Sequence, residues 1–97
     1  MTKGEYRVGI SFNPSGNFNV DTIKRSAAVL IDLIDALEDH GDGEIKRLKA
    51  HAQTVIEDGA MWAVKAATKQ PLEDELALAR SMDDHNYQQQ VEEPKEE

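Results

Sequence analysis

The stretch that decides the fold runs from Gly43 to Lys69 and ends in Glu57-Asp58-Gly59-Ala60-Met61-Trp62-Ala63-Val64-Lys65-Ala66-Ala67-Thr68-Lys69. It holds the only tryptophan of the 97-residue chain. Its apolar residues recur every three or four positions, which is the period of one helix face. They are Ile45, Leu48, Ala52, Val55, Gly59, Trp62 and Ala66. The sequence therefore predicts one long helix over residues 43–70.

A second apolar stripe comes before this helix and is separated from it by a short turn. Its members are Ile23, Ala27, Leu30, Ile34 and Leu37. They predict a helix over residues 21–39, with Asn19 or Asp21 as its N-cap. Gly41 suits the position after a helix end, and Asp42 suits the N-cap of the next helix. A connection this short makes the two helices an antiparallel hairpin.

The two ends of the chain have different patterns. Tyr6, Val8, Ile10 and Phe12 alternate with other residues, which predicts an extended segment over residues 5–14. After Gln70-Pro71, a narrow apolar stripe predicts a short helix over residues 72–82. The composition of residues 83–97 predicts a disordered acidic tail. The predicted fold is therefore all-α, with one domain over residues 1–82 followed by this tail.

The lengths of the two long helices lead to a further expectation. Helices of about 18 and about 26 residues span roughly 27 Å and 39 Å. Counted back from the turn, Asp21 lies near Met61, so residues 62–69 extend past the partner helix. We expect this surface to be covered by the N-terminal segment and by a second copy of the chain, since oligomerisation is a common remedy for a small core.

Composition excludes several classes of function. The formal charge is −8, and residues 72–97 carry nine acidic and two basic residues, which leaves −1 for residues 1–71. Binding to long nucleic acid requires a basic stripe, which this chain lacks. There is no cysteine for disulfide or thiolate chemistry. No apolar run approaches a membrane span, and no signal-peptide core is present, so we expect a soluble intracellular protein.

Catalytic patterns are missing as well. His40, His51 and His85 lack the spacing of metal ligands. The sequence has no glycine-rich phosphate loop, nucleophile elbow or zinc-protease motif. We therefore expect no enzyme activity, no metal and no cofactor.

Three short motifs together point to a known family. They are Phe12-Asn13-Pro14, Ile23-Lys24-Arg25 and Met61-Trp62-Ala63-Val64-Lys65-Ala66. In this order they resemble the helical-hairpin family of phage anti-defence sponges, whose branches act against CBASS (cyclic-oligonucleotide-based anti-phage signalling) and Thoeris systems. The start Tyr6-Arg7-Val8-Gly9-Ile10 and the acidic body resemble the anti-CBASS branch of T4-like phages. The resemblance covers about residues 6–69.

The resemblance implies a function that composition alone does not indicate. Proteins of this family sequester cyclic di- and trinucleotides made by host immune cyclases, hydrolyse nothing, and form hexamers with pockets between protomers. The resemblance therefore implies a homo-hexamer in the cytoplasm of the infected bacterial host. Signals such as 3′,3′-cGAMP and cyclic triadenylate would be its ligands, and CBASS effectors would stay inactive.

The resemblance also implies two sets of site residues. For a cyclic dinucleotide these are Tyr6, Phe12, Asn13, Pro14, Lys24 and Arg25. Aromatic rings would stack on bases, and the two cations would pair with phosphates. For a cyclic trinucleotide they are Lys65, Thr68 and Lys69. The family has tyrosine where this chain has Phe12, so stacking would survive and any hydroxyl contact would be lost.

Alternatives to this interpretation remain open. Lys24 and Arg25 would also fit ordinary ion pairs with Glu57 and Asp58 across the hairpin. Lys65 and Lys69 would also suit the basic end of any helix. For the whole chain, one alternative is an oligomeric interaction module that binds a host protein. Another is a sponge for the ADP-ribose-type signals of Thoeris systems.

Overall fold

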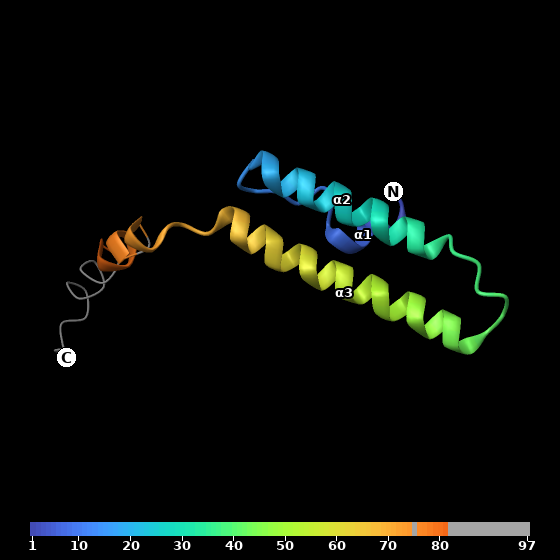
Figure 1. Cartoon of the computed structure of the whole chain (residues 1–97). Coiled ribbons are helices and arrows are strands. Elements are labelled where there is room, and N and C mark those ends of the chain that lie inside the picture. The colour runs from blue at the N-terminus through green and yellow to red at the C-terminus, as the bar shows by residue number, and fades with distance from the viewer. Residues whose placement is uncertain (75, 82–97) are drawn as a thin grey trace, which may run out of the picture.

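The computed structural model describes residues 1–74 and 76–81. Three helices make up the body: α1 (Lys3–Val8), α2 (Phe18–Asp35) and α3 (Gly43–Thr68). Figure 1 shows α2 and α3 running antiparallel, with α1 lying against them. All regular secondary structure in the described residues is helical, so the predicted all-α hairpin is confirmed.

The N-terminus begins with a helix, so the predicted extended segment is wrong. Thr2 and Glu5 form a capping box, in which the Thr2 hydroxyl accepts from the Glu5 N–H and the Glu5 carboxylate accepts from the Thr2 N–H. Gly9 then ends α1 in the left-handed conformation, with φ of 64°. The apolar alternation was misleading because Val8 is buried while Tyr6 is 78% exposed.

The second helix begins and ends earlier than predicted. Asn17, rather than Asn19 or Asp21, is its N-cap, and the Asn17 side chain accepts from the N–H groups of residues 19 and 20. The helix ends at Asp35 instead of residue 39. Asp42 caps α3 as predicted, its carboxylate accepting from the Ile45 N–H at 3.4 Å.

The register of the hairpin contradicts the predicted overhang at residues 62–69. The Asn17 side-chain amide donates to Ala67 O at 3.2 Å, so the end of α3 lies beside the start of α2. At the other end, Lys49 Nζ donates to Asp35 O at 3.1 Å. The extra residues of α3 therefore come before Lys49, at the loop end of the hairpin (Figure 1).

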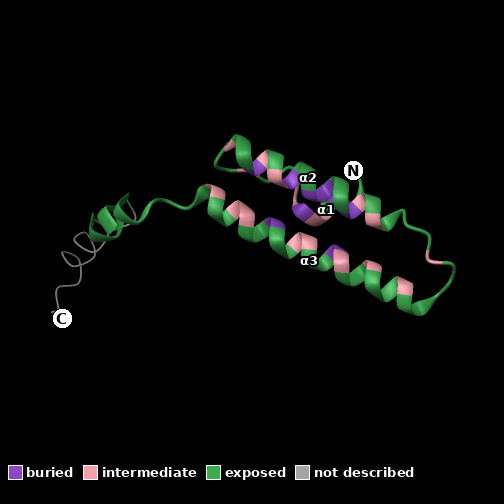
Figure 2. Cartoon of the chain, in the orientation of Figure 1, coloured by how far each residue is buried: buried purple, intermediate pink, exposed green. Residues whose placement is uncertain are grey.

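The core is small and includes Ile23 and Ala27 of the stripe predicted for the first long helix, but none of the stripe predicted on α3. Its buried members are Val8, Ala27, Ala28, Ile31 and Ala60, with Ile10, Ile23 and Ile56 packed against them. Of the stripe predicted on α3, Leu48, Val55 and Trp62 are exposed, and Trp62 is 62% exposed. Leu30 on α2 and Leu37, which follows the end of that helix, are exposed too. Figure 2 shows the buried residues confined to the facing sides of the helices. Much apolar surface therefore faces outward.

Polar side chains join the three helices. Gln53 is only 3% exposed, and its amide donates to Ile31 O at 3.0 Å and to Asp35 Oδ1 at 3.3 Å. Lys3 Nζ lies 2.9 Å from Asp35 Oδ1 and 3.4 Å from Gln53 Oε1. Arg7 Nε bonds Glu57 Oε1 at 2.7 Å. These contacts hold α1 in one position along the hairpin.

The chain continues beyond the hairpin into a second helical stretch. Residues 72–74 and 76–81 are helical and exposed, which agrees with the helix predicted there. This stretch extends away from the hairpin in Figure 1. The predicted acidic tail over residues 83–97 lies outside the described residues. None of the described helices has the length and hydropathy needed to cross a membrane.

Close packing at Gly4 gives the first prediction. The Gly4 N–H donates to Asp32 Oδ1 at 2.7 Å, and an added Cβ would overlap Ala28 O and come within 2.8 Å of that carboxylate. We expect Gly4→Ala to lower the free energy of unfolding by about 1–3 kcal/mol in urea denaturation, because α1 must move off α2. Gly43→Ala is the matched control, since a Cβ there meets nothing within 4 Å. Equal stability of the two variants would contradict this docking of α1.

The second prediction concerns acid. The Lys3 ammonium, and next the Gln53 amide, lower the pKa of Asp35 from its ordinary value. A carboxyl with a lowered folded-state pKa stabilises the fold above its unfolded pKa, and this contribution is lost as pH falls through the folded pKa. We expect the urea concentration at the unfolding midpoint to decrease when the pH is lowered below about 4. Asp35→Asn should lower the urea midpoint at pH 7, and the midpoint of this variant should change less when the pH is lowered. Asp58→Asn, at an exposed carboxyl with no ion pair in the described residues, should change neither.

Candidate functional site

A pocket of about 280 Å³ lies where the loop after α1 meets α2 and the end of α3. We call it the turn pocket. It is lined by Phe12, Asn13, Pro14, Ser15, Val20, Lys24, Val64 and Thr68. Residues far apart in the chain meet at this point because Asn17, at the start of α2, bonds Ala67 near the end of α3.

The turn that forms one wall of the pocket is held by its own side chains. Asn13 Nδ2 donates to Asn17 O at 2.9 Å and to Asp21 Oδ1 at 3.0 Å. Ser15 Oγ donates to Asn13 Oδ1 at 2.9 Å. Asparagine and serine commonly stabilise turns in this way. The position of the neighbouring Phe12 and Pro14 is therefore set before any ligand arrives.

Lys24 is the charged residue of the turn pocket, and it is 4% exposed. Its ammonium donates to Gly9 O at 3.0 Å and to Phe12 O, and it lies 5.5 Å from the centre of the Phe12 ring. A buried charge is tolerated when it is hydrogen-bonded in this way. Glu57 pairs with Arg7 instead, so the alternative pairing of Lys24 with Glu57 is wrong.

These features define what the turn pocket can bind. Val20, Val64 and Pro14 supply apolar wall, and the exposed Phe12 ring offers a stacking surface at the mouth. An ammonium has three donors, and two of the Lys24 donors are used by backbone carbonyls. The pocket suits a flat heterocycle with an anionic group nearby, but one chain supplies it with a single cation.

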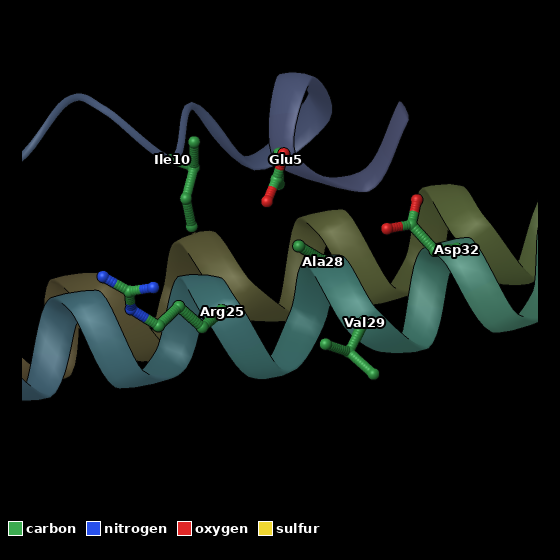
Figure 3. A pocket seen from close by; sticks show the side chains of 6 residues that line it. All are labelled: Glu5, Ile10, Arg25, Ala28, Val29 and Asp32. Atoms are coloured by element: carbon green, nitrogen blue, oxygen red, sulfur yellow. The ribbon is translucent and has the colours of Figure 1, made fainter. Parts of the chain in front are cut away.

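A second pocket of about 240 Å³ lies between α1 and α2. It is lined by Glu5, Ile10, Arg25, Ala28, Val29 and Asp32. Figure 3 shows Arg25 and Asp32 at opposite ends of this row, with Ala28 and Val29 between them. Within the described part of the chain, the Arg25 guanidinium has no ion pair or hydrogen bond, so the alternative pairing with Glu57 or Asp58 is not formed. It is available to an anion.

The structure groups the predicted site residues differently from the sequence. Thr68, assigned to the trinucleotide set, lines the turn pocket together with Phe12, Asn13, Pro14 and Lys24 from the dinucleotide set. Arg25 lines the second pocket, and Tyr6 lines neither. Lys65 Nζ lies 5.2 Å from the centre of the Trp62 ring, and Lys69 is the C-cap of α3. The ligand contacts of all nine residues stay predictions.

Several lining residues were not predicted, although helical spacing indicates some of them. Val20 is four residues before Lys24, and Val64 is four residues before Thr68, so each pair shares a helix face. Asp32 follows Arg25 by seven residues, or about two turns. Glu5 and Ile10 had no such signal, because the segment that carries them was predicted to be extended.

No group of histidine and carboxylate side chains in the described residues has an arrangement that would hold a metal ion.

Comparison with known proteins gives one finding. A protein-family model described as Acb2/Tad1, hairpin domain, matches residues 5–68. No curated protein and no solved structure matches the chain. The matched range includes both pockets and every predicted site residue except Lys69.

The bonds of Lys24 lead to the third prediction. Lys24→Met keeps the length of the side chain but leaves Phe12 O without the ammonium donor and Gly9 O with only the Phe12 N–H. We expect the variant to lose about 1–3 kcal/mol of stability, because the charge-assisted hydrogen bonds that join this loop to α2 are removed. Hydrogen exchange at residues 9–16 should also become faster. Lys65→Met is the control, since that ammonium is exposed, and it should leave both measurements unchanged. Unaltered exchange in Lys24→Met would show that this lysine does not hold the turn.

Proposed function

Since the chain belongs to the Acb2/Tad1 hairpin family, the family of phage anti-CBASS and anti-Thoeris sponge proteins, we propose that it sequesters cyclic di- and trinucleotide immune signals. Ligands such as 3′,3′-cGAMP and cyclic triadenylate would be held intact, and CBASS effectors would lack their activator. The protein would act in the cytoplasm of the infected bacterium, as a binder rather than an enzyme.

The observation that carries this proposal is the composition of the turn pocket. It brings residues of all three family-like motifs together, since Phe12-Asn13-Pro14, Lys24 and Val64 share one cavity. A base would stack on the exposed Phe12 ring, as bases stack on aromatic residues in single-strand recognition. The Lys24 ammonium, 5.5 Å from that ring, would face the attached phosphate with its remaining donor.

Charge supports a site shared between copies of the chain. A cyclic dinucleotide carries two phosphates, whereas Lys24 is the only cation among the residues that line this pocket. A two-fold axis would supply each cation and each ring twice, matching a ligand of approximate two-fold symmetry. Arg25, without a partner in the described residues, would add a second cation from a neighbouring protomer.

Exposed apolar residues on α2 and just after its end also support assembly. Val29, Leu30, Leu33 and Leu37 are all exposed in the single chain. Their side chains would be removed from water in a homo-oligomer, which we propose to be a hexamer. A large outward apolar surface is uncommon on a protein that stays monomeric.

Ligand retention tests the proposal and gives the fourth prediction. The purified protein is incubated with 3′,3′-cGAMP or cyclic triadenylate, separated from free ligand, denatured, and assayed by mass spectrometry. We expect unmodified ligand to be released in a fixed ratio to protomer. Recovery of a hydrolysed product would contradict a sponge. In a parallel incubation with an ADP-ribose-type signal, retention of that molecule while neither cyclic nucleotide is retained would assign the chain to the anti-Thoeris function.

A matched pair of variants locates the site. Phe12→Ala removes the proposed stacking ring, and Phe18→Ala removes an equally exposed ring that lines neither pocket. We expect Phe12→Ala to weaken retention by roughly 5-fold or more, because stacking on one aromatic contributes about 1–3 kcal/mol. Phe18→Ala should retain ligand like the unmodified chain. Equal retention by both variants would exclude Phe12 from the site.

A further inference from the structure

The side of α2 that faces away from the hairpin carries a cation, an anion and exposed apolar side chains. At about 100° of rotation for each residue, Arg25 and Asp32 lie about 40° and 60° from Val29, both on the same side of it. Leu33 lies about 40° from Val29 on the other side, and both apolar residues are exposed. Figure 3 shows Arg25 and Asp32 on the α1 side of α2, with Val29 pointing away from α1. We call the surface made by these four residues the Val29 face.

Both charges of the Val29 face have unused hydrogen-bonding capacity. Among the residues that the structure describes, none forms an ion pair or hydrogen bond with the Arg25 guanidinium. Asp32 Oδ1 accepts from the Gly4 N–H at 2.7 Å, and no bond within the described ranges uses Asp32 Oδ2. The two charges lie seven residues apart, or about 10 Å along the helix, and they do not pair with each other. Each can therefore pair with an opposite charge from another molecule.

This row of residues is complementary to a second copy of itself. We propose that the Val29 face packs antiparallel on the Val29 face of another copy of this chain, with a two-fold axis beside Val29. Each Arg25 then lies level with Asp32 of the other copy, because in a two-fold interface residue i meets residue j and residue j meets residue i. An antiparallel two-fold pair brings equal sides of the helices together, so the two charges also meet on the same flank. Leu33 packs beside Ser26 of the other copy on the opposite flank.

Charge opposes the other ways of pairing these two helices. In a parallel pair each residue lies level with its own counterpart, so Arg25 meets Arg25 and Asp32 meets Asp32. Sliding the antiparallel pair by seven residues brings two Arg25 side chains together in one direction and two Asp32 side chains in the other. Flanking charges set the partner and the orientation of paired helices in this way. Of these arrangements, only the proposed one joins opposite charges.

The interface is separate from the turn pocket, since no residue of the Val29 face lines it. A guanidinium has five N–H donors, so Asp32 can use one edge of the Arg25 side chain while the other edge binds a phosphate. The interface rests on the charges and exposure of α2, and not on nucleotide binding. Ligand retention without this interface would overturn the interface and leave the proposed function intact.

Disulfide trapping tests the register, because the chain has no cysteine of its own. Val29→Cys places each thiol next to its counterpart at the two-fold axis, where the two Cα atoms are within the roughly 7 Å that a disulfide allows. Leu33→Cys is the matched control, since Val29 and Leu33 are 68% and 60% exposed. In the proposed register, the two copies of position 33 lie about 14 Å apart along the helices, too far for a disulfide. Each full-length variant is oxidised at the same concentration, and the linked dimer is quantified by non-reducing electrophoresis.

We expect the Val29→Cys dimer to form at least about tenfold faster than the Leu33→Cys dimer. Equal rates would indicate a parallel or non-specific contact and would overturn the proposal. Faster linkage of Leu33→Cys would show that the helices pair in another register. Linkage of Val29→Cys no faster than in urea would exclude this interface altogether.

Charge reversal tests the ion pairs independently of the register. In the Val29→Cys background, Arg25→Glu places a carboxylate level with each Asp32, and we expect linkage to slow by at least about threefold because two ion pairs become repulsive. Lys46→Glu in the same background makes the same charge change at an exposed position on α3, outside the Val29 face, and should leave the rate unchanged. Equal rates in these two variants would show that charge does not select the second copy.

Discussion

The buried ammonium of Lys24 is the interaction on which the rest of the site depends. A charge that is 4% exposed is tolerated only with hydrogen-bonding partners, and Gly9 O and Phe12 O are the carbonyls that supply them. Both come from the loop that follows α1, so this loop must fold over α2. The position of the Phe12 ring follows from that constraint. Burial of Lys24 and formation of the turn pocket are therefore one structural event.

The small core explains why polar contacts matter so much in this chain. Its buried apolar residues are largely alanine and valine, with Ile31 as the largest fully buried side chain. A core of this size gives marginal stability in a short chain. Gln53 and the Arg7–Glu57 pair then decide how α1 sits on the hairpin. The larger apolar residues remain outside, where the proposed assembly would cover them.

The three short motifs within the matched segment lie in different parts of the structure. The Phe12-Asn13-Pro14 and Lys24 motifs converge on the turn pocket. Val64 of the third motif also lines this pocket, whereas Met61 and Trp62 of the same motif are exposed on α3. One stretch of α3 therefore contributes both to the pocket and to the outward apolar surface.

Local signals in the sequence determined the helices of this protein and the hairpin that joins them. Residue periodicity, the Asp42 cap and the glycine before it act over a few positions, so they can be recognised without the fold. The capping box at Thr2 and Glu5 is equally local, and this pattern indicates the start of a helix where the apolar alternation indicates an extended segment. The family resemblance was readable as well, because short motifs carry it.

Only the tertiary structure decided which helix faces are buried and which residues meet. Both long helices carry more apolar surface than one partner covers. Periodicity therefore could not decide whether the face with Trp62 or the face with Ala60 is buried, and the structure buries the face with Ala60. The choice depends on α1, which fills the space beside Gln53 and Ile31. The partners of Lys24 and the bond from Asn17 to Ala67 span 12 to 50 positions in the sequence. Such contacts are set by the packing of whole helices, so local pattern alone does not reveal them.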